Sequence, residues 1–198
     1  MYKTLAALTL AAAAAAVPMP QTGSAIGAKP EQSDLFALAM DYKGTFVTLT
    51  AVSNGTVGNM VLSAGRPSVY PGTPAYFNGT GEYKALNFYV DDANFGGSSV
   101  YGLRAKQIPD GESYARSVDA LFGFQEFEWT VSANGTIGHR ETEALNRFYA
   151  CEDTASKGDN IFLKWGEDTK DGKPPAGCVE TFVIQDFDVP GGQHSGSS

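Results

Sequence analysis

From residue 34 onward the chain consists of short apolar or alternating runs separated by Gly, Pro, Asn and Asp. This pattern strongly constrains the fold, because alternation with a period of two indicates half-buried strands. The 23 glycines and 10 prolines interrupt the chain too regularly for long helices. We therefore predict an all-β fold, a single antiparallel β-sandwich or barrel-like domain over residues 34–188 with little helix.

The strands are expected where apolar or β-branched residues cluster between turn residues. Residues 140–148 have weak helical character, enough for a turn or two. In 122–131 alternate positions share a face, and Phe127, Trp129 and Val131 are the better core-facing set. The runs predicted as strands are 35–40, 45–52, 59–63, 82–90, 99–105, 122–131, 146–151, 161–165 and 178–187.

The tripeptide Asn-Gly-Thr begins at Asn54, Asn78 and Asn134. Asn-Gly is the preferred pair for a two-residue type I′ hairpin turn, in which both residues need positive φ. The same tripeptide is an acceptor for N-linked glycosylation. We predict hairpin turns at Asn54 and Asn134 and sugar attachment at all three asparagines. At Asn78 the flanking strands are less clear, and attachment there depends on exposure.

The first residues resemble a secretory signal peptide, with Lys3 followed by an apolar run that ends near Val17. That run is shorter than the roughly 20 residues needed to span a bilayer. We expect a signal peptide at 1–16, with cleavage after Ala16 or as late as Ala25. Residues 17–33 are then a flexible arm and 189–198 a disordered tail. The polar C-terminal end argues against a lipid anchor signal, so a secreted, extracellular chain without a membrane anchor is expected.

Cys151 and Cys178 are the 2 cysteines of the chain. An even number in an exported protein favours one disulfide bond, and two free buried thiols are the alternative. The formal net charge is −8, and the acidic residues are mostly scattered. Because no basic stripe is present, nucleic acid is excluded as an expected partner.

Catalytic patterns are weak throughout the sequence. The 2 histidines, His139 and His194, accompany no Gly-x-Ser-x-Gly motif. Glu126 and Glu128 leave a small hydrolase as a weak alternative, since paired carboxylates can hydrolyse glycosides. Asp91–Asp92 indicates a turn rather than a calcium loop. The expectation is a protein that is not an enzyme, with no cofactor and no metal.

Aromatic residues make up 12% of the chain. Exposed on a sheet, Trp129 and Trp165 would provide contacts for carbohydrate. Aromatic residues are also common strand formers and core residues, and this second interpretation stays open.

The C-terminal third has an aromatic residue and Ala before Cys151, a polar loop, an apolar strand, a Pro-rich turn, Cys178 and a final strand. This order, over 146–187, resembles the fungal secreted cell-wall proteins of the PhiA type, phialide-development proteins also met as IgE-binding antigens. Residues 85–114 are similar to the family's acidic turn, aromatic strand and Ile-Pro-x-Gly segment. The resemblance covers roughly 46–187, without the early cysteine pair of the family.

The resemblance implies a non-enzymatic, glycosylated protein of the fungal cell wall or secretome, associated with conidium formation and wall integrity. On this basis Cys151 and Cys178 correspond to the family's disulfide. Cell-wall polysaccharide or wall proteins are the implied partners, and the oligomeric state is not implied. The alternative function is an extracellular binding module for polysaccharide or a host protein, acting as an effector or antigen through exposed aromatic residues.

Overall fold

The computed structural model describes residues 32–64, 72–105, 114–140, 147–152 and 160–188. These residues form strands and one short 3-10 helix, η1. In chain order the elements are β1 (Ala37–Tyr42), β2 (Thr45–Ser53), β3 (Asn59–Ala64), β4 (Ala75–Asn78), β5 (Lys84–Asp92), η1 (Ala93–Phe95), β6 (Gly97–Ala105), β7 (Ala115–Phe122), β8 (Phe127–Val131), β9 (Ile137–His139), β10 (Arg147–Glu152), β11 (Ile161–Gly166), β12 (Cys178–Thr181) and β13 (Val183–Asp186).

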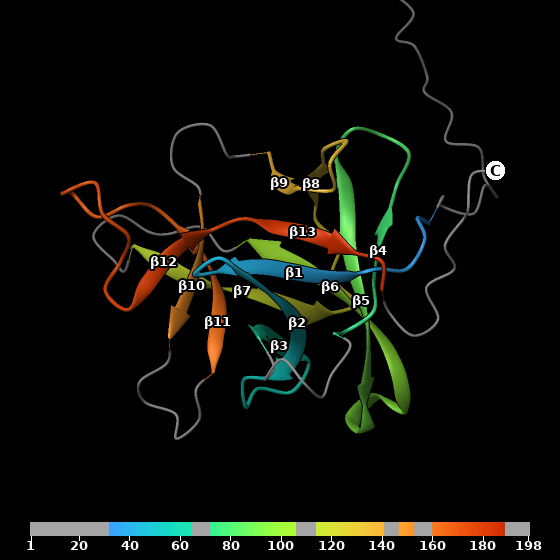
Figure 1. The fold of residues 1–198 in the computed structure, drawn as a ribbon. Coiled ribbons are helices and arrows are strands. Elements are labelled where there is room, and N and C mark those ends of the chain that lie inside the picture. Colours follow the sequence, from blue (N-terminus) through green and yellow to red (C-terminus); the bar gives the residue numbers. More distant parts are fainter. Residues whose placement is uncertain (1–31, 65–71, 106–113, 141–146, 153–159, 189–198) are drawn as a thin grey trace, which may run out of the picture.

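The strands form one large antiparallel sheet that is nearly closed into a barrel, which confirms the predicted fold class (Figure 1). The main path runs β13-β1-β2-β3-β11-β7-β6-β5-β8-β9. Strand β4 pairs with β5, while β10 pairs with both β11 and β12. The two ends of the path meet through a bridge between Thr136 and Ile184 and a bond from the Gln185 N–H to the Gly135 carbonyl. Closure leaves few unpaired strand edges.

The interior of the barrel is packed with apolar side chains. Along β1, Leu38 and Met40 belong to the core, whereas Ala39 between them lies on the other face. This alternation is the period-two pattern of the sequence. The largest side chains with almost no exposure are Trp129, Tyr101, Tyr149, Phe36, Phe77, Phe88, Leu38, Met40, Leu49, Leu62, Leu86 and Leu103.

Strand β11 lies between β3 and β7 at one end of the barrel. At their other ends β3 and β7 pair directly, with Met60 opposite Ala120. Further along they separate, so Ser63 pairs with Phe162 and Ser117 pairs with Lys164, both in β11. At that end of the barrel β2, β3, β11 and β7 therefore lie side by side.

The predicted strand 122–131 is wrong as a single element, because β7 ends at Phe122 and β8 begins at Phe127. Between them the chain crosses β6 so closely that a Cβ on Gly102 would lie 1.9 Å from the Phe124 carbonyl oxygen. The Glu126 carboxylate accepts the Ala105 N–H at 3.1 Å and holds this crossing segment. Glycine at 102 is required by this contact, since any side chain there would displace the crossing segment.

The other predicted strands match in position, with four further differences. Strands β4 and β7 were not predicted, and neither was the short β9. The predicted strand 178–187 divides at Phe182, because β12 pairs with β10 and β13 pairs with β1. The weak helical segment 140–148 falls largely outside the described residues, and its last two residues begin β10.

The signal peptide, most of the arm and the tail also lie outside the described residues. The last residues of the predicted arm, Gln32 and Ser33, are paired with β4. The Ser33 N–H donates to the Phe77 carbonyl at 3.0 Å, and the Ser33 hydroxyl accepts the Phe77 N–H at 2.9 Å. Strand pairing therefore begins two residues before the predicted domain boundary.

Candidate functional site

The first Asn-Gly-Thr tripeptide lies in the exposed loop 54–58 between β2 and β3. The Asn54 Oδ1 accepts the Thr56 N–H at 2.9 Å, and the Ser53 hydroxyl accepts the Gly55 N–H at 3.2 Å. Gly55 has φ 88°, whereas Asn54 has a negative φ. The hairpin is confirmed, but the type I′ turn is wrong, because five residues connect the strands.

The Asn134 tripeptide lies at the exposed tip of the β8–β9 hairpin. The Gly135 N–H donates to the Ser132 carbonyl at 2.9 Å, and Gly135 has φ 81°. The Ser132 N–H donates to the Thr136 carbonyl at 2.9 Å and closes a three-residue loop, 133–135. Asn134 keeps a negative φ and the loop ends in a left-handed glycine, so it is not a type I′ turn. The Asn134 Oδ1 accepts bonds from the Ser132 hydroxyl and the Thr136 N–H.

A two-residue turn with positive φ at both positions occurs instead at Lys43 (φ 52°) and Gly44 (φ 81°), between β1 and β2. The Lys43 Nζ lies 2.8 Å from the Glu152 carboxylate, which also accepts the Tyr42 hydroxyl. Sequence preference for Asn-Gly did not identify this turn, because Lys is uncommon at a left-handed position.

Asn78 differs from the other two asparagines, because it ends β4 inside the sheet. It pairs with Ala85 on one side and forms a bridge to Gln32 on the other. Its exposure is 7%, and its Oδ1 is buried without a hydrogen-bond partner. The exposure assumed for sugar attachment at Asn78 is therefore wrong for the folded chain.

Cys151 and Cys178 form the predicted disulfide, with Cα atoms 4.0 Å apart on the paired strands β10 and β12. The alternative of two free thiols is wrong. In the chain-entropy model a bond that closes a loop of this length stabilises by about 3 to 4 kcal/mol.

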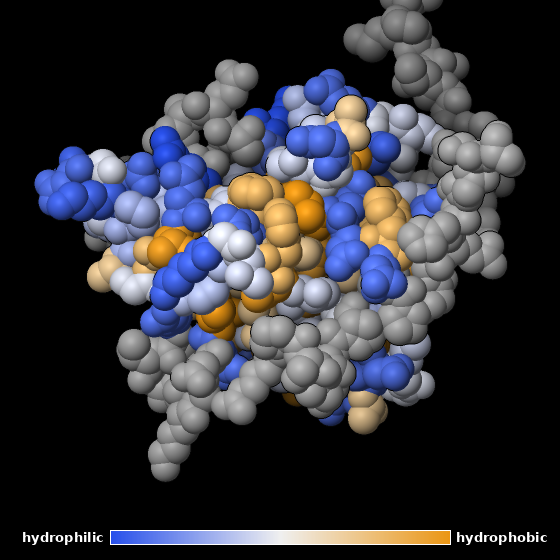
Figure 2. Space-filling view, viewed as in Figure 1, coloured by the Kyte–Doolittle hydropathy of each residue, from blue (hydrophilic) through white to orange (hydrophobic). Residues whose placement is uncertain are grey.

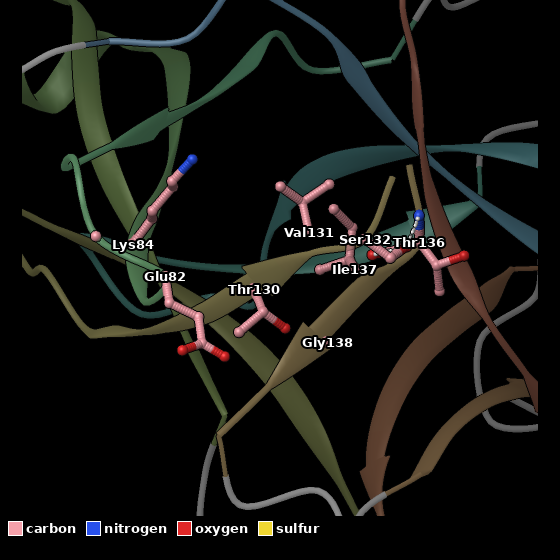
Figure 3. A pocket seen from close by; sticks show the side chains of 9 residues that line it. Glu82, Lys84, Thr130, Val131, Ser132, Thr136, Ile137 and Gly138 are labelled. Carbon is pink, nitrogen blue, oxygen red and sulfur yellow. Dashed lines mark hydrogen bonds between the residues drawn. The ribbon is translucent and has the colours of Figure 1, made fainter. Parts of the chain in front are cut away.

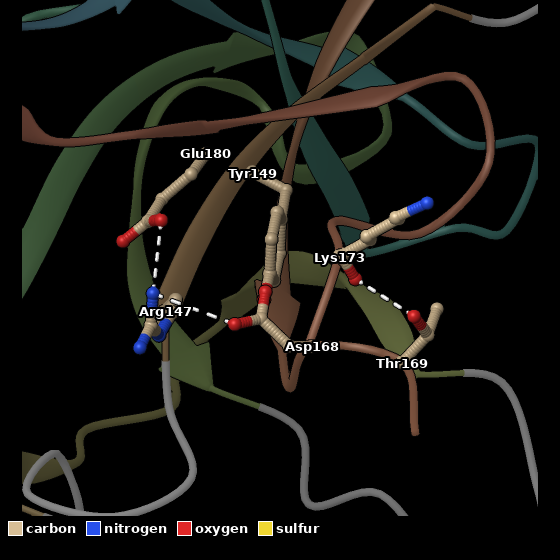
Figure 4. Close-up of polar contacts among 6 residues, drawn as sticks. All are labelled: Arg147, Tyr149, Asp168, Thr169, Lys173 and Glu180. Atoms are coloured by element: carbon tan, nitrogen blue, oxygen red, sulfur yellow. Dashed lines mark hydrogen bonds and ion pairs between the residues drawn. The ribbon is translucent and has the colours of Figure 1, made fainter. Parts of the chain in front are cut away.

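A polar cluster next to this disulfide connects β10 with β12 and with the loop after β11 (Figure 4). Arg147 lies 2.9 Å from Glu180 and 3.5 Å from Asp168, and the Tyr149 hydroxyl donates to Asp168 at 2.9 Å. Burial, and then the Asp168 carboxylate, raises the pKa of Tyr149 above its ordinary value. The phenol therefore stays protonated, and these groups satisfy one another in a structural network.

The two tryptophans are core residues, which is a correction to their proposed carbohydrate contact. Trp129 is 0% exposed and Trp165 is 2% exposed. The His139 ring packs edge-on against both, with ring centres 4.8 Å and 5.4 Å away. The face prediction for β8 is right for Trp129 and wrong for Phe127, which is 50% exposed.

Exposed aromatic residues lie elsewhere on the barrel. Phe46 and Phe182 form an edge-to-face pair with ring centres 5.6 Å apart. Figure 2 shows apolar residues gathered at the centre of the face where Figure 1 places β13, β1 and β2. Phe95 and Phe122 are stacked with ring centres 3.9 Å apart, next to Gly58 of the 54–58 loop.

Of the two glutamates considered for hydrolysis, Glu126 has side-chain contacts that are structural. The Glu126 Oε2 lies 3.3 Å from the His139 Nε2, in addition to its bond with the Ala105 N–H. Glu128 is half-buried, and its carbonyl accepts the Arg140 N–H at 2.8 Å. The Glu126 contacts hold the crossing segment onto β6 and β9.

Hollows in the surface lie near both exposed asparagines. The hairpin cavity, about 430 Å³, lies between the start of β5 and the β8–β9 hairpin, with Lys84 and Glu82 on one side and Val131 and Ile137 on the other (Figure 3). The sheet groove, about 640 Å³, lies on β2, β3, β11, β7 and β10, and Asn54 lines it. Both volumes are in the range of about 300 to 1,000 Å³ typical of small-molecule sites.

Sequence reasoning did not find the sheet groove, because its residues are brought together by strand pairing. In the described part of the chain, no group of three His, Cys, Asp or Glu side chains is placed to hold a metal ion. None of its helices is long and apolar enough to cross a membrane. The chain matches no protein-family model, no curated protein and no solved structure.

Proposed function

We propose that this chain is a secreted, N-glycosylated, non-enzymatic structural protein of a fungal cell wall or surface, linked to conidium or wall development. The observation that carries the proposal is that Asn54 and Asn134 are exposed in the same way. Both lie exposed on hairpin loops, and each side-chain oxygen is fixed by the N–H of the Thr two residues later.

This geometry leaves the amide nitrogen available as the sugar acceptor. The hydrogen bonds found among the described residues do not use the Nδ2 of Asn54 or Asn134. Glycosylation sites of secreted proteins lie on surface loops. The Cys151–Cys178 disulfide supports the same compartment, because such bonds persist in oxidising environments.

Wall polysaccharide or wall proteins are the proposed partners, in keeping with the PhiA-type resemblance. Asn78 is excluded from the proposed glycosylation sites, because a sugar there would have to replace the contacts that β4 makes with Ala85 and Gln32.

Mass spectrometry of the secreted full chain, before and after enzymatic removal of N-glycans, tests the proposal. The expected result is sugar at Asn54 and Asn134, none at Asn78, and an N-terminus after Ala16 to Ala25. Sugar-free asparagines at both hairpins, or a chain retained in the cytoplasm, would overturn it.

A second candidate function is binding to polysaccharide through exposed aromatic residues. With both tryptophans buried, the exposed Phe46–Phe182 pair is the platform that favours it, since the two side chains are 53% and 45% exposed. Pull-down on chitin and β-glucan should lose the protein when Phe46→Ala and Phe182→Ala are combined. A Phe127→Ala variant, on an exposed side chain of another strand, is the matched control.

A further inference from the structure

We infer that the sheet groove binds the glycan attached to Asn54, so that the first sugar units of this glycan pack on the protein surface. The inference rests on the proposed glycosylation of Asn54 and goes beyond it by assigning the glycan a binding site. Asn54 itself lines the groove, so its first sugar unit starts at the edge of the hollow.

Strand register places the groove residues on one face of the sheet. Val52 of β2 lies opposite Val61 of β3, and Ser63 of β3 lies opposite Phe162 of β11. Lys164, two residues along β11, therefore shares the face of Phe162 and lies opposite Ser117 of β7. The groove thus extends from the Asn54 loop across four neighbouring strands.

The lining matches the chemistry of a sugar ring. Val52, Val61 and Phe162 are half-buried and offer an apolar surface for the C–H face of N-acetylglucosamine. Ser117 offers a hydroxyl group, while the Ser63 hydroxyl donates to the Ile161 carbonyl at 3.3 Å. Lys164 forms no ion pair with another described residue. A sugar ring that covers the apolar side chains can keep its hydroxyl groups hydrogen-bonded to these polar groups or to water. The cost of burying unpaired polar groups is thereby avoided.

The floor of the groove is closely packed and cross-linked, which favours an ordered glycan. Ser63 is 5% exposed and Cys151 is 3% exposed, and Cys151 is held by the disulfide bond. A preorganised surface loses little conformational freedom when a ligand covers it.

Two matched variants distinguish the effect of the glycan from the effect of the asparagine side chain. Thr56→Ala removes the Asn54 acceptor motif and Thr136→Ala removes the Asn134 motif, while both asparagines stay. We expect Thr56→Ala to lower the thermal midpoint of the secreted full chain by about 2 to 4 °C. Amide exchange should become faster in 59–64 and 161–164. Thr136→Ala should leave the exchange of these segments unchanged.

A double-mutant cycle with Phe162→Ala tests direct contact. Phe162→Ala should lower the midpoint more in the glycosylated chain than in the Thr56→Ala background, because coupled sites are not additive. Additive shifts, or equal exchange in Thr56→Ala and Thr136→Ala, with sugar present on Asn54, would overturn this inference alone. Absence of sugar from both asparagines overturns the proposed function as well, and mass spectrometry of the same samples distinguishes the two failures.

Discussion

The carboxylate of Asp92, the last residue of β5, accepts a hydrogen bond from the Tyr101 hydroxyl group on the neighbouring strand β6. Tyr101 is 0% exposed and Asp92 is 6% exposed. The other carboxylate oxygen accepts the Asn94 N–H at 2.8 Å and caps η1. The Tyr101 hydroxyl, followed by the Asn94 N–H, holds the pKa of Asp92 below its ordinary value of 3.8. Burial, followed by the Asp92 carboxylate, raises the pKa of Tyr101 to about 12.

Acid should destabilise the fold partly through Asp92. Its pKa is lower in the folded than in the unfolded chain, so its contribution is complete above the unfolded pKa and is lost as pH falls through the folded value. Tyr101→Phe removes the largest cause of this shift. We expect a shallower fall in the free energy of unfolding for this variant, measured by urea titration from about pH 6 to pH 2. Parallel curves for the variant and the parent would contradict the assignment.

Loss of the disulfide should lower the free energy of unfolding, and the size of this effect should not depend on which cysteine is replaced. Cys151→Ala and Cys178→Ala each open the same loop, so each should lower the free energy of unfolding by about 3 to 4 kcal/mol. The double variant should lie close to the single variants, because the bond is lost only once. Urea unfolding of the non-reduced proteins measures these differences, and an additive double variant would show that the thiols act separately.

The burial of Trp129 predicts a large effect on stability. Its ring lies in the core, and its Nε1 donates to the Leu103 carbonyl at 3.1 Å. Trp129→Ala should therefore lower the free energy of unfolding by about 3 to 5 kcal/mol, because it leaves a cavity in the core. Phe46→Ala, on an exposed aromatic residue, should change the free energy of unfolding by no more than about 0.5 kcal/mol. Comparable losses for the two variants would contradict the placement of Trp129.

Gly102 should tolerate no side chain. Gly102→Ala forces a methyl group against the Phe124 carbonyl. It should therefore lower the free energy of unfolding by about 1 to 3 kcal/mol and release the 123–126 crossing segment. Gly81→Ala is the matched control, since a Cβ there meets only backbone atoms of Tyr83, at 3.7 Å or more. Thermal unfolding and amide exchange at 123–126 measure both variants, and a neutral Gly102→Ala would refute the close crossing.

Features that depend on nearby residues could be predicted from the sequence. Alternation and frequent turn residues predict an antiparallel β domain, and Asn-Gly-Thr at Asn54 and Asn134 predicts two exposed hairpin loops. The turn types were wrong, because both loops are longer and only glycines in them have positive φ. The Ser53 hydroxyl accepts the Gly55 N–H in one loop, and the Ser132 hydroxyl donates to the Thr136 carbonyl in the other. The pairing of Cys151 with Cys178 followed from there being just two cysteines in the chain.

The tertiary structure decided which side of each strand is covered and which distant residues meet. Periodicity places Phe127 and Trp129 on one face, yet Trp129 packs against Phe148 and His139 and is buried, whereas Phe127 is exposed. Asn78 carries the same tripeptide as Asn54, but pairing with Ala85 and Gln32 hides it. The groove beside Asn54 exists because register aligns Val61, Phe162 and Lys164. Local propensity acts over a few residues, whereas burial and register depend on contacts between residues far apart in the chain.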